Sequence, residues 1–170
     1  YTFDVMLPTI SNFSTVGNNL MQYSIQAGGS AVWPTANLAH YYPIVVTEDV
    51  TCAQLFVFNG GVVSGNIDVG LYNSAGTRLI SSGSTVQAGI SDLQVFNVAD
   101  TSVPKGYYYI GVSLDNITGT LYRNLIQTPH SRAIGNLSQA TAFPLPATAT
   151  FAAIASGYVG LAGLTRVTTL

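Results

Sequence analysis

The chain has 170 residues, a length that suits one domain, and only 7% of them are charged, against about 25% in an average soluble domain. Five basic and seven acidic residues give a net charge of −2, so there is no basic patch for phosphates and nucleic-acid binding is not expected. The hydrophobic fraction of 48% disfavours intrinsic disorder, and Cys52, the single cysteine, excludes a disulfide within the chain.

So few charges leave the surface to Ser, Thr, Asn, Gln, Gly and Tyr. Free domains rely on interspersed charges for solubility. The composition therefore indicates either a secreted domain with a neutral surface or a subunit that hides its surface in a large assembly, and the second is favoured. No stretch reaches the roughly 18 apolar residues of a transmembrane helix, so no membrane contact is expected.

Residues 1–40 are predicted to form an extended N-terminal arm. The segment is rich in Asn, Ser and Gly, with short extended candidates at residues 1–6 and 20–26. Gly28-Gly29 and Trp33-Pro34 oppose any helix here, because Gly and Pro interrupt regular structure.

Residues 41–124 are predicted to form the core of an antiparallel β-sandwich of the jelly-roll type. Short apolar and β-branched segments alternate here with turns rich in Gly, Asn, Asp and Pro. The predicted strands are residues 41–47, 51–58, 64–72, 77–82, 93–98, 107–114 and 118–123. No window of comparable quality has the 3.6-residue period of a helix, so the predicted fold class is all-β with extended arms at both ends.

Two uncharged segments are predicted to be covered. Residues 52–58 are apolar on both sides, so the arm or a neighbouring subunit should cover the outer side. Residues 125–170 form a charge-poor C-terminal segment, with no charged side chain from 133 to 165. Such a tail would aggregate in solvent, so we expect it to return to the sandwich as an edge strand or to dock on another chain. A short strand is favoured over a helix at residues 151–154.

The titratable residues do not form a recognisable catalytic motif. His40 and His130 are predicted in loops, and neither lies in a nucleophile-elbow motif. Asp68, Asp92 and Asp115 could in principle supply a pair of catalytic carboxylates, but nothing singles them out. The expectation is a protein without catalytic residues.

The other polar side chains predict structural roles. Alternation in the strand at 64–72 places Asp68 outward, where a cross-strand hydrogen bond or ion pair with Arg78 or Arg123 is favoured. Calcium could use the acidic turns at 48–49 or 115–116, although such residues usually cap their own backbone. One Cys and two His make zinc improbable, and no Gly-rich motif opens a helix, so no metal or cofactor is expected.

The aromatic residues carry the one positive binding signal. Tyr107 and Tyr109 share one strand face, Tyr72 occupies another outward face, and Trp33 lies in the arm. Such aromatic residues flanked by amides can stack on sugar rings. The alternative, which is favoured, is that the arm or a partner chain covers them, because interfaces are also enriched in Tyr and Trp.

Several blocks carry a resemblance to a known group of proteins. They are residues 33–39 (WPTANLA), 65–79 (GNIDVGLYNSAGTRL), 106–112 (GYYYIGV) and 115–123 (DNITGTLYR). Over about half of its length the chain resembles virion proteins of tailed bacteriophages that contain a jelly-roll or β-sandwich domain. The resemblance implies a module of a capsid decoration protein, head fibre or tail tip, and it brings no catalytic or binding residues with it.

The favoured function is therefore that of a virion structural protein without enzymatic activity. It would decorate or cement a capsid, or form a fibre, and would hold neighbouring subunits through its arms. Its expected partners are the major capsid or tail protein and further copies of itself, with a trimer favoured, in an extracellular virion. The alternative is a carbohydrate-binding module of a receptor-binding or tail-fibre protein that uses Trp33, Tyr72, Tyr107 and Tyr109. An enzyme acting on polysaccharides is the third and least supported hypothesis.

Overall fold

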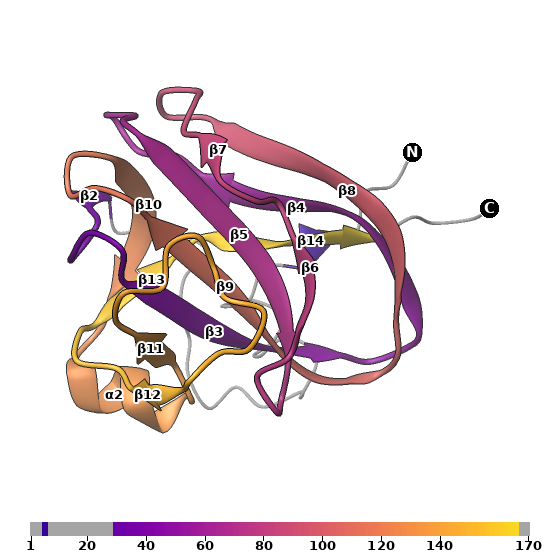
Figure 1. Ribbon diagram of the computed structural model, residues 1–170. Helices are drawn as coiled ribbons and strands as arrows, with labels where there is room; N and C mark the ends of the chain where they lie inside the picture. The colour runs from indigo at the N-terminus through magenta and orange to yellow at the C-terminus, as the bar shows by residue number, and fades with distance from the viewer. Residues whose placement is uncertain (1–4, 7–28, 167–170) are drawn as a thin grey trace.

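The computed structural model describes residues 5–6 and 29–166, and its strands form where β-branched and aromatic residues dominate between turn residues (Figure 1). In the first half they are β1 (Val5–Met6), β2 (Ser30–Val32), β3 (Ala39–Val46), β4 (Val50–Phe58), β5 (Asn66–Asn73), β6 (Arg78–Ser81) and β7 (Thr85–Val86). The second half contains β8 (Leu93–Val103), β9 (Gly106–Leu114), β10 (Thr120–Leu125), α2 (Thr128–Ala133), β11 (Leu137–Gln139), β12 (Ala152–Ala153), β13 (Tyr158–Gly160) and β14 (Ala162–Arg166).

All seven strands predicted between residues 41 and 124 are present, as β3, β4, β5, β6, β8, β9 and β10. Strand β8 runs further than expected, because an irregularity opposite Ala53 lets a second ladder form with the start of β4. The short helix α2, with a proline in its first turn, was not expected. The favoured strand at 151–154 is present as β12. The extended segment predicted at 20–26 lies outside the described residues, as does most of the one at 1–6.

The strands form two facing antiparallel layers, as predicted for an all-β sandwich (Figure 1). One layer contains the strands β12-β11-β3-β9-β5-β6 in that order, with β7 also paired to β5. The other contains β1-β14-β4-β8 and β13-β10-β2. Leu161 joins these two smaller sheets: its N–H donates to the carbonyl of Tyr122 (3.0 Å) and its carbonyl accepts from the N–H of Phe58 (2.9 Å).

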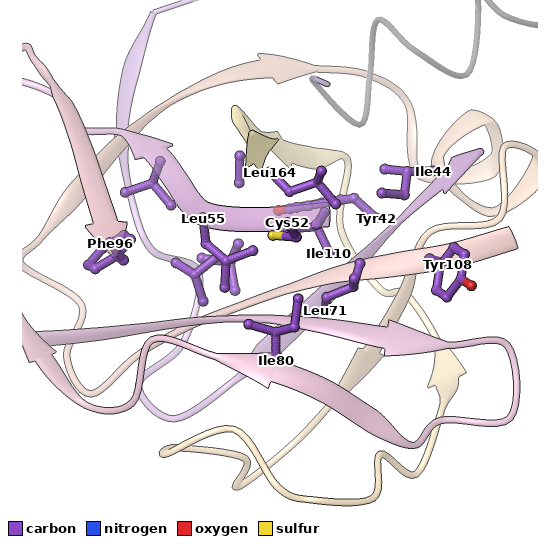
Figure 2. Packing of buried hydrophobic residues seen from close by; sticks show 14 of the residues in the cluster. Tyr42, Ile44, Cys52, Leu55, Leu71, Ile80, Phe96, Tyr108, Ile110 and Leu164 are labelled. Carbon is purple, nitrogen blue, oxygen red and sulfur yellow. The ribbon is translucent and has the colours of Figure 1, made fainter. Parts of the chain in front are cut away.

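The main core lies between the two layers (Figure 2). Side chains on a strand alternate between its two faces, so alternate residues of the longer strands, such as β5 and β9, enter this core. Figure 2 shows the inward side chains of both layers meeting, among them Leu55 and Cys52 from β4 and Leu71 and Ile110 from β5 and β9. Each of these four is fully buried.

A second apolar cluster lies on the outer face of the β3–β9–β5 layer. Residues 140–151, here called the covering segment, cross this face and bury its tyrosines Tyr41 and Tyr72. The hydroxyl of Tyr72 donates to the carbonyl of Pro146 (2.7 Å), and the N–H of Ala142 donates to the carbonyl of Asn37 (2.7 Å). The covering segment therefore belongs to the sandwich, held by both backbone and side-chain hydrogen bonds.

Candidate functional site

Three connections between strands lie at one end of the sandwich (Figure 1). They join β4 to β5, β7 to β8 and β9 to β10. Exposed apolar side chains lie in these connections or directly beside them. The exposed fractions are 47% for Val62, 66% for Val86, 65% for Ile90 and 59% for Ile117. We call these four side chains the end surface. Val62, Ile90 and Ile117 lie in the connections themselves, and Val86 ends β7 directly before one of them. Exposed apolar side chains gathered at one end of a protein are a candidate contact surface.

A buried amide, Gln87, ties the three connections together beneath the end surface. Its Nε2 donates to Oδ1 of Asn59 (2.9 Å) and to the carbonyl of Thr120 (2.9 Å). Its Oε1 accepts from the N–H of Ser64 (3.0 Å), and its own N–H donates to the carbonyl of Gly65 (3.0 Å). With only 3% of Gln87 exposed, each polar group of its amide has a partner, as a buried amide requires.

Further side chains lock the same loops from either side. The hydroxyl of Thr120 both accepts from the N–H and donates to the carbonyl of Val62, each at 2.9 Å. The carboxylate of Asp115 accepts from the N–H and Nδ2 of Asn66, both at 3.0 Å, and from Nδ2 of Asn116 (2.7 Å). The acidic turn predicted as a possible calcium site thus directs its carboxylate to its own neighbours.

The end surface is consequently preorganised and nearly uncharged. Asp92 and Asp115 are the only charged residues in the three connections, and Asp115 is engaged as described. Rigid loops lose little conformational freedom on binding, so an apolar contact made by them keeps most of its favourable free energy. Chemically, this arrangement fits association with another apolar surface.

The four aromatic residues predicted as a platform do not lie on one surface. Trp33 is buried between the layers, where its ring contacts Tyr158 (5.3 Å between centroids) and His40 (4.9 Å). Its Nε1 donates to the carbonyl of Leu38 (2.9 Å). Tyr72 lies on the outer face of its sheet, as alternation predicts, but the covering segment buries it completely. Neither ring face of Trp33 or Tyr72 is therefore accessible to a sugar, and both residues pack inside the protein, the interpretation that the sequence favoured over sugar binding.

The other two tyrosines remain together on β9. Tyr107 is 75% exposed, and Tyr109, two residues along the same face, is half-buried with its ring 4.9 Å from that of Phe151. The cover over this face comes from the chain's own C-terminal segment. Of the four aromatic residues, Tyr107 is the one whose side chain is exposed enough to stack on a ligand.

Neither histidine lies in a loop, contrary to the prediction. His40 belongs to β3 and is 1% exposed, and His130 belongs to α2. Burial lowers the pKa of His40 to about 4, because a low-dielectric interior disfavours the charged imidazolium. Its Nδ1 lies 3.3 Å from the hydroxyl of Tyr42, and its Nε2 has no hydrogen-bond partner.

Asp68 lies on the outer face of its sheet, as alternation predicts, but the covering segment buries it there, and it pairs with neither predicted arginine. Its Oδ1 accepts from the hydroxyls of Ser81 (2.9 Å) and Ser82 (3.2 Å), and its Oδ2 accepts from the N–H of Leu145 (3.0 Å). The guanidinium of Arg78 donates instead to the carbonyl of Leu145. The covering segment supplies this cover, and local alternation could not reveal it.

Arg123 lies against an aromatic ring. Its Cζ is 5.1 Å from the ring centroid of Tyr158, a cation–π contact. Nε and Nη1 of this guanidinium are buried without a hydrogen-bond partner.

Other features that bear on ligands can be stated for residues 5–6 and 29–166. No group of three or more His, Cys, Asp or Glu side chains there could hold a metal ion. Cys52 is a buried core residue, as the apolar character of its strand suggested, and burial raises its pKa to about 11. No helix in this part of the chain is long and apolar enough to cross a membrane.

The end surface was missed at the level of sequence, although a signal for it existed. Val62, Ile90 and Ile117 stand in turn segments next to Gly, Ser or Asn, outside any alternating strand pattern. Apolar residues in such positions cannot be assigned to a core by periodicity. No protein-family model, curated protein or solved structure matches the chain.

Proposed function

We propose that this protein is a structural subunit of a virion, a β-sandwich that decorates or cements a capsid or forms part of a fibre, and that it has no catalytic role. The observation that carries the proposal is the end surface, with its exposed apolar side chains on and beside loops held together by Gln87. The low charge and the resemblance of residues 33–123 to bacteriophage virion proteins support the same role.

On this proposal, the end surface binds a neighbouring subunit such as the major capsid or tail protein. Burying Val62, Val86, Ile90 and Ile117 gives roughly 25 cal/mol for each Å² of apolar surface removed from water. Since the loops are already fixed, little of this gain is lost to ordering them. Permanent attachment to a particle needs such a surface and no reactive group.

The direct test is the composition of purified particles. Mass spectrometry of particles from a lysing culture of the source organism should find the chain in a fixed ratio to the shell or fibre protein. Finding it only in the fraction that does not sediment with particles would overturn the proposal.

Binding to particles that lack the chain tests the surface itself. We expect Ile117→Asp to weaken association by about tenfold or more, because an aspartate in an apolar contact is desolvated without a partner. Leu125→Asp is the matched control, since Leu125 is 68% exposed at the far end of β10 and should bind like the wild type. Equal loss with both variants would show that this end has no special role.

A second candidate function rests on the exposure of Tyr107. With Tyr109 and Phe151 beside it, Tyr107 could stack on a sugar ring, as in a carbohydrate-binding module of a receptor-binding fibre. Tyr107→Ala should then abolish binding on a glycan array, while Leu125→Ala leaves it unchanged. No binding of the wild type to any glycan would count against this function and leave the virion role standing.

A further inference from the structure

Strand β8 is an open edge of its sheet. In the order β1-β14-β4-β8, β8 has β4 on one side, and no described strand pairs with its other side. An open edge presents unpaired N–H and C=O groups, which are a template for another strand.

The hydrogen bonds around β4 show which residues of β8 face the open side. The N–H of Asn59 donates to the carbonyl of Asp92 (2.9 Å), whereas the N–H of Phe58 donates to Leu161 in the opposite direction (2.9 Å). Paired residues in an antiparallel ladder alternate between hydrogen-bonded and non-hydrogen-bonded. The residues whose backbone groups face away from β4 are therefore Leu93, Val95 and Asn97.

This part of the edge lacks the usual protection. Between Leu93 and Asn97 there is no charge, no Pro and no Lys, the residues that natural edge strands use against pairing. Leu93 is 43% and Val95 is 42% exposed. The pairing of β8 with β4 becomes irregular only beyond Asn97, where residues 98–100 lie opposite Ala53 alone. A regular, uncharged stretch of five residues is left open by the described strands.

We propose that residues 93–97 of β8 pair antiparallel with the same residues of a second copy of this chain, with Val95 on the two-fold axis. The two β1-β14-β4-β8 sheets then join into one continuous sheet. In this register Val95 pairs with its own copy and Leu93 pairs with Asn97 of the copy, which makes about six backbone hydrogen bonds between the two strands. In two of these six, one from each copy, the N–H of Leu93 exchanges its present bond to Oδ1 of Asp92 (2.7 Å) for the carbonyl of Asn97.

The pattern of backbone groups and charges selects a second copy as the partner. An antiparallel ladder has two-fold symmetry, so the strand complements itself without a second sequence. The register at Val95 also keeps the flanking acids Asp92 and Asp100 apart. A shift to a two-fold axis at Phe96 would set Asp92 opposite Asp100 of the copy, and like charges directly opposite are destabilising.

A cysteine on the proposed axis tests the contact. The native Cys52 is fully buried, so Val95→Cys gives one accessible thiol. Facing Cα atoms in a hydrogen-bonded pair lie about 5.5 Å apart, within the range for a disulfide. Mild oxidation of the purified full chain at high concentration should convert most Val95→Cys into a covalent dimer. The control Tyr107→Cys, on an exposed site of β9, should form several-fold less.

Charge at the axis provides the second variant. Val95→Lys brings two like charges together in the dimer and should shift sedimentation of the chain toward the monomer by about tenfold in dissociation constant. Its unfolding midpoint, read from Trp33 fluorescence, should stay close to that of the wild type, because Val95 lies outside the core. Equal cross-linking of Val95→Cys and Tyr107→Cys, a wild type that remains monomeric at every concentration, or an unaltered dimer in Val95→Lys would each overturn the proposal. These results concern the isolated chain, so they leave the virion role to its own test.

Discussion

Replacing Asp68 with alanine should loosen the covering segment and lower the stability of the whole sandwich. Asp68 is fully buried on β5 and accepts three hydrogen bonds: two from serine hydroxyls, of Ser81 and Ser82, and one from the N–H of Leu145. The last of these joins the central layer to the covering segment.

The magnitude follows from what each donor loses. In Asp68→Ala the N–H of Leu145 remains buried without an acceptor, which lowers the free energy of unfolding by about 1–3 kcal/mol. The hydroxyl of Ser82 already lies 3.1 Å from the carbonyl of Gly83, so it finds another acceptor, and the hydroxyl of Ser81 loses a charge-assisted bond. Removing the desolvated carboxylate offsets part of this loss. The expected decrease in the free energy of unfolding is about 3 kcal/mol.

Urea unfolding followed by the fluorescence of Trp33, the single tryptophan and 1% exposed, measures this decrease. With a slope of about 2 kcal/mol per molar urea, the midpoint should fall by about 1.5 M. Asp100→Ala, an exposed carboxylate on β8, is the matched control and should change stability by less than about 0.5 kcal/mol. A loss below about 1 kcal/mol in Asp68→Ala would refute the reasoning.

Other expected outcomes concern buried groups. Burial lowers the pKa of His40 from 6.5 to about 4, so on acidification the unfolded chain binds a proton at this residue before the folded chain does. The free energy of unfolding should therefore fall by up to about 3 kcal/mol as the pH is lowered from 6.5 to about 4. His40→Gln should remove this part of the pH dependence in urea titrations, and an unchanged slope would contradict it. Gly111→Ala would bring a Cβ to 2.9 Å from the ring of Tyr72 and 3.0 Å from that of Tyr41, which should cost about 2 kcal/mol; a thermal midpoint equal to the wild type would contradict this. Cys52, whose pKa burial raises to about 11, should react with a thiol reagent at mildly alkaline pH only after unfolding, so rapid labelling of the folded chain would count against its burial.

Alternation along β5 and β9 shows how much the sequence could predict. A period of two residues places Val69 and Leu71 on one face of β5 and Ile110 on one face of β9, and all three lie in the main core. It also placed Asp68 and Tyr72 on the opposite face. It could not predict that residues more than 70 positions later cover that face, because strand periodicity is local whereas the covering contact is not.

The start of β3 also shows that local sequence does not reveal the effect of distant strands. A loop was predicted around His40, after Trp33 and Pro34, yet β3 begins at Ala39 and pairs with both β9 and β11. Pairing on two sides stabilises residues whose local sequence favours a turn. Trp33 likewise lies inside the sandwich, where its indole N–H donates to the carbonyl of Leu38 and so is not left without a partner.

The position of β14 has a consequence for how the chain is made. This strand lies between β1 and β4, although it comes from the last residues of the described chain. During synthesis, β4 can pair with β8 early. The other side of β4 stays open until β14 is made, more than a hundred residues after the end of β4. We therefore expect a chain interrupted before residue 158 to expose β4 as a hydrophobic edge and to aggregate, so premature termination would yield an insoluble product instead of a shortened working subunit.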